Sequence, residues 1–221
     1  NELIMGIEEA KKKNISISLK GFGNSYGDEF INENNMLIVL SGMNKILSWD
    51  NSTGVMSVEP GITVQEVLKT CLQDNWVLPV VPGARFPTIG GCVSNNVHGK
   101  NSFKEGNFGE CVLSFDILLS SGEVTTCSKK QNMDLFYAAI GGIGMLGIFT
   151  KINLQLKKIN TPNLQVRKWT VPNIETMLND MYNSTENCDY VIGQIDCFAK
   201  KKNLGRGTIH VASQIRRRME D

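Results

Sequence analysis

The sequence predicts an α+β fold, in which a glycine-rich ligand-binding unit is followed by the beginning of a second unit. Short helical and strand-like segments follow one another without a regular β-α repeat, which argues against a doubly wound parallel sheet. Glycine is unevenly spread, with 18 of the 21 glycines at or before Gly147 and three after it. Because glycine gathers where the backbone turns sharply or approaches a ligand, we expect the first part of the chain to surround a ligand.

Local patterns predict the elements in order. Alternation of apolar and polar residues indicates strands, and Thr63 with Glu66 three residues later is the capping box typical of a helix start. Ser121-Gly122 marks a tight turn between two strands. We expect helices over 6–14, 63–75, 134–140 and 174–182, and strands over 15–19, 36–40, 55–58, 114–119, 123–127, 147–156, 165–171 and 190–196.

Pro162 marks the joint between the two units. It lies in the polar stretch 160–163 directly after a strand-like run, and proline cannot continue strand pairing. We therefore divide the chain into a ligand-binding domain over 1–160 and a partial second domain over 161–221. Because the chain starts at Asn1 rather than Met and ends in a charged tail, we expect it to be a fragment of a longer protein.

The composition excludes several function classes. Lys and Arg total 23 against 22 Asp and Glu, a net charge of +1, so we expect no nucleic-acid partner held by phosphate contacts. No stretch reaches the roughly 18 apolar residues that a membrane span needs, and the most apolar one, 138–149, contains four glycines. The sequence therefore predicts a globular protein without a transmembrane helix.

The cysteines predict free thiols. There are six, without a C-x-x-C spacing, and His98 and His210 are the only histidines, so we expect no metal site. A disulfide framework is not typical of a chain this long. Buried free thiols indicate a reducing compartment, which predicts a cytoplasmic location.

Three glycine-rich segments interrupt the predicted elements of the first domain. The loop 20–28 follows a strand, but Tyr26 stands where a nicotinamide-type G-x-G-x-x-G needs its third glycine. Such a turn can still present successive backbone N–H groups to a pyrophosphate, although an ordinary surface turn is the alternative.

The second segment, 88–101, ends like a phosphate-binding P-loop but has Ser94 and Asn101 where that motif needs glycine and Ser or Thr. The third segment is 141–148. Three such segments separated by regular elements indicate one extended ligand, and a dinucleotide suits them better than a small phosphate ester.

An ordered set of motifs joins these segments. The set consists of the Gly21–Ser25 loop, the Val58–Gly61 turn before a helix, Leu78-Pro79 leading to Pro82-Gly83, Thr88–Gly91, and Gly141-Gly142 before Leu146–Ile148. Over about residues 7–158 the sequence resembles the FAD-binding domain of the vanillyl-alcohol-oxidase superfamily, the PCMH-type flavoproteins. The resemblance implies a two-subdomain PCMH-type domain followed by the beginning of an α+β substrate (cap) domain.

Narrower motifs resemble one branch of that superfamily, the bacterial decaprenylphosphoryl-β-D-ribose 2′-oxidases. They are Ser25–Asp28, His98–Asn101, Gly106–Gly109 and Leu204–Gly207. The resemblance implies an FAD-dependent oxidoreductase that oxidises a CH–OH group of a sugar or polyol. Two alternatives stay open: an aldonolactone or alditol oxidase that uses oxygen, and a flavin-binding module without turnover.

The resemblance also implies residue roles. The residues expected at FAD are Gly21, Phe22, Gly23, Asn24, Ser25, Tyr26, Gly83, Thr88, Ile89, Gly90, Gly91, Asn95, Asn96, His98 and Ile148. Members of the superfamily with flavin attached through histidine carry that histidine where this chain has Asn24, so we expect noncovalent FAD.

Oxidising a secondary alcohol requires a group that takes the hydroxyl proton or stabilises the oxyanion. A histidine can take up a proton, a lysine is cationic and a tyrosine can donate a hydrogen bond, so His98, Lys100 and Tyr26 are the expected catalytic residues. The alternatives are a histidine that orders its loop, a solvated lysine and a packing tyrosine.

The resemblance and the distribution of basic residues also predict partners. We expect a small-molecule or lipid-linked sugar substrate, with a partner reductase as a further hypothesis. The basic runs Lys200–Lys202, with Arg206, and Arg216–Arg218 are candidates for contact with a membrane surface, and the alternative is solvated loops. A membrane contact would place the protein at the inner face of the membrane.

Overall fold

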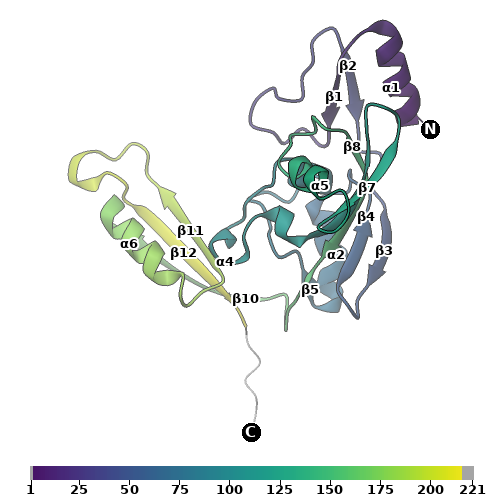
Figure 1. The fold of residues 1–221 in the computed structure, drawn as a ribbon. Helices are drawn as coiled ribbons and strands as arrows, with labels where there is room; N and C mark the ends of the chain where they lie inside the picture. Colours follow the sequence, from purple (N-terminus) through teal and green to yellow (C-terminus); the bar gives the residue numbers. More distant parts are fainter. Residues whose placement is uncertain (1, 216–221) are drawn as a thin grey trace.

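The computed structural model describes residues 2–215 and shows a larger and a smaller unit, which Figure 1 displays in purple to teal and in green to yellow. Helices and strands mix in both units without a β-α repeat, which confirms the α+β class. Among the described residues no helix is both long and apolar enough to cross a bilayer. No group of three or more His, Cys, Asp or Glu side chains in this part of the chain is arranged to hold a metal ion.

The chain begins with a small subdomain. Helix α1 (Glu2–Lys13) precedes the parallel pair β1 (Ile17–Lys20) and β2 (Met36–Val39). Ile7 of α1 is buried and packs with Leu118 and Ile148 of the adjoining sheet. The small subdomain is therefore anchored on the larger one by an apolar contact, and the long loop between β1 and β2 remains free to reach a ligand.

An antiparallel five-stranded sheet forms the centre of the larger unit. Its order is β3-β4-β8-β6-β7, with bounds β3 (Ile46–Asp50), β4 (Val55–Val58), β6 (Val112–Leu118), β7 (Val124–Ser128) and β8 (Ile148–Gln155). Phe115 of β6 stacks on Phe136 at 5.3 Å and meets Phe149 edge-on at 4.7 Å between ring centroids. These rings join the sheet to its helices in one hydrophobic core.

Helices and short strands surround this sheet. They are α2 (Val64–Cys71), the 3-10 helix η1 (Leu72–Asp74), α3 (Ile89–Ser94), α4 (Ser102–Glu105), the 3-10 helix η2 (Phe108–Cys111), α5 (Met133–Ala139) and the pair β5 (Trp76–Val77) and β9 (Lys157–Lys158). Thr63 Oγ1 accepts from Glu66 N at 3.2 Å, and the Glu66 carboxylate accepts from Thr63 N at 2.9 Å. The expected capping box of α2 is confirmed.

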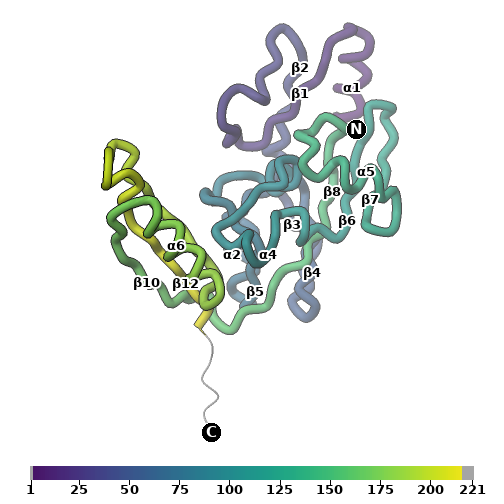
Figure 2. Tube along the Cα trace, turned by 60° about the vertical axis from the view of Figure 1, so that its left-hand side comes forward, coloured from purple at the N-terminus to yellow at the C-terminus, as the bar shows by residue number. Residues whose placement is uncertain are grey.

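The second unit is a separate three-stranded antiparallel sheet in the order β10-β12-β11 with one helix. Its bounds are β10 (Leu164–Val171), α6 (Ile174–Ser184), β11 (Tyr190–Ile195), the 3-10 helix η3 (Lys201–Asn203) and β12 (Gly207–Gln214). Met177 of α6 is buried with Val191, Ile209 and Val211 of the sheet in a small core of its own. Figure 2 shows α6 lying along this sheet, and the division of the chain at residue 160 stays a prediction.

The two units meet at α4. Val191 N of β11 donates to Lys100 O at 2.9 Å, and Lys104 Nζ forms an ion pair with Asp189 Oδ1 at 2.7 Å. Glu105 forms a further ion pair with Lys157, which precedes the joint. These contacts fix the beginning of β11 against the segment that follows α3.

Candidate cofactor cleft

A cleft of about 260 Å³ lies between the small subdomain and the central sheet, and all three glycine-rich segments border it. The expected cofactor residues that line it are Gly21, Phe22, Gly23, Asn24, Ser25, Tyr26, Thr88, Gly90, Gly91 and Asn95. Gly144 and Gly147 line it from the third segment. Tertiary structure thus brings together segments that are more than 100 residues apart in the chain.

The loop after β1 presents bare backbone to the cleft. Within residues 2–215, the N–H groups of residues 22–26 donate to no acceptor in the protein. Gly23 has φ of 68°, a left-handed conformation that glycine adopts without strain. Unpaired backbone amides that border a cleft require an acceptor from solvent or from a ligand, so this loop suits an anion.

Gly21 brings this loop against the start of α3. A Cβ at position 21 would lie 2.4 Å from Thr88 Oγ1, so any side chain would push the loop away. Thr88 is the N-cap of α3, and its Oγ1 accepts from Gly91 N at 3.2 Å. Gly90 is also closely packed, since its Cβ would lie 2.8 Å from Pro60 Cβ. Glycine at these positions allows two backbone segments to form one wall of the cleft.

The third segment is fastened to the end of α3. Gly141 N donates to Val93 O at 3.0 Å and Ile143 N donates to Ser94 O at 2.9 Å. Asn95 Nδ2 donates to Gly91 O at 3.0 Å, and Asn96 Oδ1 accepts from Gly109 N at 2.9 Å. Asn95 borders the cleft, whereas the Asn96 side chain accepts a hydrogen bond from η2.

Besides Asn96 and His98, three expected cofactor residues do not line the cleft, namely Ile89, Ile148 and Gly83. The Ile89 side chain is fully buried in the main core, and its N–H donates to Ile62 O at 2.8 Å. Ile148 is buried in the cluster that anchors α1. The structure therefore gives both isoleucine side chains a packing role, because apolar side chains at an α-helix start and a strand start turn into the core. Gly83 is exposed and does not line the cleft.

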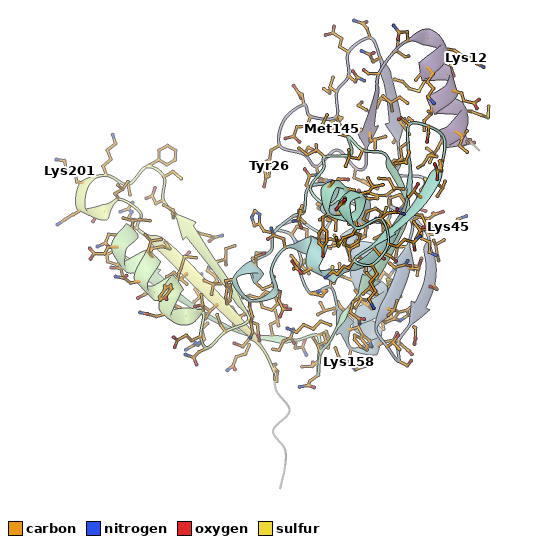
Figure 3. The ribbon with its side chains drawn as sticks, in the orientation of Figure 1. Lys12, Tyr26, Lys45, Met145, Lys158 and Lys201 are labelled. Carbon is orange, nitrogen blue, oxygen red and sulfur yellow. The ribbon has the colours of Figure 1, made fainter. Side chains whose placement is uncertain are left out.

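The expected catalytic residues differ in their relation to the cleft. Tyr26 is fully exposed on the cleft wall, and in Figure 3 it lies at the edge of the larger unit that faces the second unit. His98 and Lys100 are exposed and do not line the cleft, but Val97 before them does. The segment 97–100 thus runs from the cleft to β11, where Lys100 O accepts from Val191 N.

Residues 1–128 match the family described as FAD binding domain. The chain belongs to this FAD-binding family. The match confirms the resemblance seen in the glycine-rich motifs and assigns FAD as the cofactor.

The relatives of this FAD-binding domain include oxidases of different substrates. This chain is 31% identical to decaprenylphosphoryl-beta-D-ribose oxidase of Mycolicibacterium smegmatis over 192 residues. The aligned region covers 86% of this chain and 42% of that protein. The chain is 32% identical over 119 residues to a putative D-arabinono-1,4-lactone oxidase of Neurospora crassa, covering 54% of this chain and 21% of that protein. The chain thus spans less than half the length of these relatives.

The cleft fits FAD in its chemistry. The unpaired amides of residues 22–26 suit a pyrophosphate, and the glycine wall at Gly21 and Gly90 admits a ligand close to the backbone. Lys20, which also lines the cleft, holds its ammonium group 4.7 Å from the centre of the Phe30 ring. A cation at the base of this loop favours an anionic ligand.

Sequence reasoning missed several residues of the cleft. They are Leu19, Lys20, Glu29, Phe30, Leu40, Pro60, Pro87, Ser94, Val97, Ile143, Gly144, Gly147 and Phe149. Lys20 and Gly147 each lie within a segment that the sequence analysis singled out, so the motifs found the right segments. The motifs do not show which residues of a segment border the cleft, because that depends on the element packed against the segment.

Proposed function

We propose that the whole protein is an FAD-dependent oxidoreductase that oxidises a CH–OH group of a sugar or polyol and holds its FAD noncovalently. The observation that carries this proposal is the cradle of unpaired amides at residues 22–26, closed by the contact of Gly21 with Thr88. When bound, FAD accepts a hydride from the carbon that carries the hydroxyl group. The chain itself must then bind the pyrophosphate, orient the substrate and handle the hydroxyl proton.

The backbone of the β1–β2 loop performs the first task. The N–H groups of residues 22–26 have no acceptor in the protein and would donate to the pyrophosphate oxygens, and Lys20 would add positive charge at the same loop. Gly90 and Gly91 line the next part of the cleft. Residues without side chains permit close approach of an extended ligand along this wall.

His98 and Lys100 are the residues that we assign to the substrate. The segment 97–100 leads from the cleft wall to the first residues of β11, so it lies where a second unit can cover a substrate. We assign to the His98 imidazole the uptake of the hydroxyl proton, and to the Lys100 ammonium group stabilisation of the resulting oxyanion. Tyr26 is assigned a hydrogen bond from its hydroxyl group to the substrate.

The residue at position 24 determines how the flavin is held. A carboxamide cannot form the covalent bond that a histidine makes with the flavin in relatives that carry one at this point of the loop. The Asn24 side chain borders the cleft and makes no hydrogen bond to any other described residue. We therefore propose a dissociable cofactor.

A first experiment separates the cofactor from the reaction. The whole protein is purified and precipitated with acid, and the visible spectrum of the supernatant is recorded. Flavin bands in the supernatant support noncovalent FAD, whereas bands that remain in the pellet contradict it. A colourless protein that takes up no added FAD contradicts the proposed cofactor site.

A second experiment tests the reaction. A panel of sugars, polyols and lipid-linked sugars is added without oxygen, and loss of the oxidised flavin absorbance identifies a substrate. His98→Ala and Lys100→Met should slow this bleaching by about 100-fold while the FAD affinity is retained, since acid-base catalysis contributes on this scale. A flavoprotein that no member of the panel bleaches supports the alternative of a binding module without turnover.

The second candidate is an aldonolactone or alditol oxidase that uses oxygen, and the similarity to the Neurospora crassa protein favours it. Hydrogen peroxide formed with soluble lactones or polyols would support this candidate. Turnover with an artificial acceptor but not with oxygen would instead support a partner reductase.

A further inference from the structure

The connection between β11 and β12 protrudes as a basic loop with an exposed aromatic residue. We define the basic loop as residues 196–206. It contains Lys200, Lys201, Lys202 and Arg206 against one acidic residue, Asp196, and therefore carries a net charge of +3. Because the whole chain carries +1, the rest of the chain sums to −2, so positive charge is concentrated here.

The acidic residue does not neutralise the lysines. Asp196 Oδ2 accepts from Arg206 Nε at 2.9 Å and from Arg206 Nη2 at 2.7 Å, and Asp196 Oδ1 accepts from Phe198 N at 2.9 Å. The Arg206 guanidinium lowers the pKa of Asp196. The ion pair joins the two ends of the loop, so the three lysines extend beyond it without a counter-charge from the loop.

The base of the loop is firmly packed. Ile174 N donates to Leu204 O at 2.8 Å, and Gly205, with φ of 77°, lies so close that its Cβ would meet Ile174 Cβ at 2.5 Å. Ala199 N donates to Asp196 O at 3.3 Å. The loop is thus held by α6 in one conformation at its base and presents its outer residues to solvent.

The exposed side chains of the basic loop are partly apolar and partly charged. Phe198 is 90% exposed and Leu204 is 58% exposed, on either side of the lysine run. In Figure 3 Lys201 lies at the tip of the second unit, at the end away from the larger unit. Aromatic side chains gain from burial among acyl chains and lysines gain from anionic headgroups, so the loop has both groups that a lipid surface recognises.

We propose that the basic loop docks the protein on an anionic phospholipid membrane, with Phe198 inserted into the interface and Lys200–Lys202 on the headgroups. This surface is independent of the FAD cleft. It would hold the second unit at the bilayer through the end that lies away from the larger unit (Figure 3). If the protein does not bind membranes, the proposed oxidoreductase function still holds.

Vesicle flotation tests the proposal on the purified whole protein. It should float with vesicles of phosphatidylcholine mixed with phosphatidylglycerol, float less at high salt, and not float with phosphatidylcholine alone. Replacing Lys200, Lys201 and Lys202 by Gln should weaken vesicle binding on the order of 100-fold, and Phe198→Ser about tenfold. The matched control replaces Lys11, Lys12 and Lys13, the exposed lysine run of α1, and should leave binding unchanged.

Fluorescence tests the insertion of residue 198 itself. The emission that Phe198→Trp adds to the parent spectrum should lie at long wavelength without vesicles, and should shift to shorter wavelength and be quenched by brominated lipid. Tyr182→Trp, at an exposed position of α6, is the control that should not respond. Three results would overturn the proposal. The first is equal vesicle binding by the lysine variant and the control, and the second is binding to nucleic acid but not to vesicles. The third is emission of Phe198→Trp at short wavelength before lipid is added.

Discussion

Gly21 and Thr88 lie so close that a Cβ on residue 21 would be 2.4 Å from the Thr88 hydroxyl oxygen. Gly21 begins the β1–β2 loop and Thr88 caps α3, so this contact joins the two subdomains that border the cofactor cleft. The hydroxyl group is itself held by its bond from Gly91 N, and it cannot turn away without uncapping the helix.

Gly21→Ala should therefore displace the loop. We expect about 1–3 kcal/mol of lost unfolding free energy from overpacking, and a lower FAD affinity because the amides of the loop move from their places. Chemical unfolding and FAD titration measure the two effects. Gly42→Ala, where an added Cβ meets nothing within 4 Å, is the matched control and should be neutral.

A double-mutant cycle identifies the cause. Thr88→Ala alone should cost about 1 kcal/mol through loss of the helix cap. Combined with Gly21→Ala it should cost less than the sum, because the obstructing hydroxyl and methyl groups are gone. Strictly additive costs would show that the two residues do not restrict each other.

Lys20 offers a separate test of how the cleft binds its ligand. Its ammonium group lies over the Phe30 ring at the base of the amide-rich loop. Lys20→Met should weaken FAD binding about tenfold, because a charge-assisted contact with the pyrophosphate is lost. Riboflavin, which lacks the pyrophosphate, should bind both proteins equally, and Lys45→Met should change neither affinity. Equal losses for FAD and riboflavin would exclude a charge effect.

The junction of the two units should depend on pH through Asp189. Partial burial opposes its ionisation, but the hydrogen bonds from Lys104 Nζ and Gln214 N prevail and hold the pKa of the carboxyl group below its ordinary 3.8. A lowered carboxyl pKa stabilises the folded chain above the ordinary value, and this stabilisation disappears as the pH falls through the folded value.

Asp189→Asn should consequently lower the melting temperature at neutral pH, and its difference from the parent should shrink below about pH 4. Thermal unfolding of both proteins across this range measures the effect. Glu123→Gln, an exposed carboxyl group without an ion-pair partner within residues 2–215, should melt like the parent throughout. A difference that does not vary with pH would contradict the role of the charge.

Of the six cysteines, one should react rapidly with a thiol reagent and five should react slowly. Burial raises the pKa of Cys71, Cys92 and Cys111 to about 12, and it raises the pKa values of Cys127 and Cys188 as well. Cys197 is exposed. Because the thiolate is the reactive form, a disulfide reagent should modify one thiol rapidly in the folded protein and six after unfolding. Cys197→Ser should remove the fast phase, and a remaining fast phase would show that a buried thiol is accessible.

The elements that the sequence predicted well are those with strong local signals. The Thr63–Glu66 capping box starts α2 as expected, and the turn at Ser121-Gly122 joins β6 to β7 in an antiparallel pair. The helix expected over 6–14 begins earlier, at Glu2, since an acidic first turn also stabilises it. Strands β3 and β12 were not predicted, and pairing with neighbouring strands stabilises both.

The sequence by itself indicated an extended dinucleotide ligand, because glycine spacing is a local property that limits which backbone segments can approach a ligand, and the resemblance of its motifs to the PCMH-type flavoproteins implied FAD. Only the tertiary structure decided which residues face the cleft. Thr88 and Gly91 border it while Ile89 is buried between them, since the short helix α3 turns successive residues to different sides. The fold also decides which basic residue Asp196 neutralises. The pairing of β11 with β12 brings Arg206 to the Asp196 carboxylate, so this carboxylate does not pair with the lysines of the basic loop.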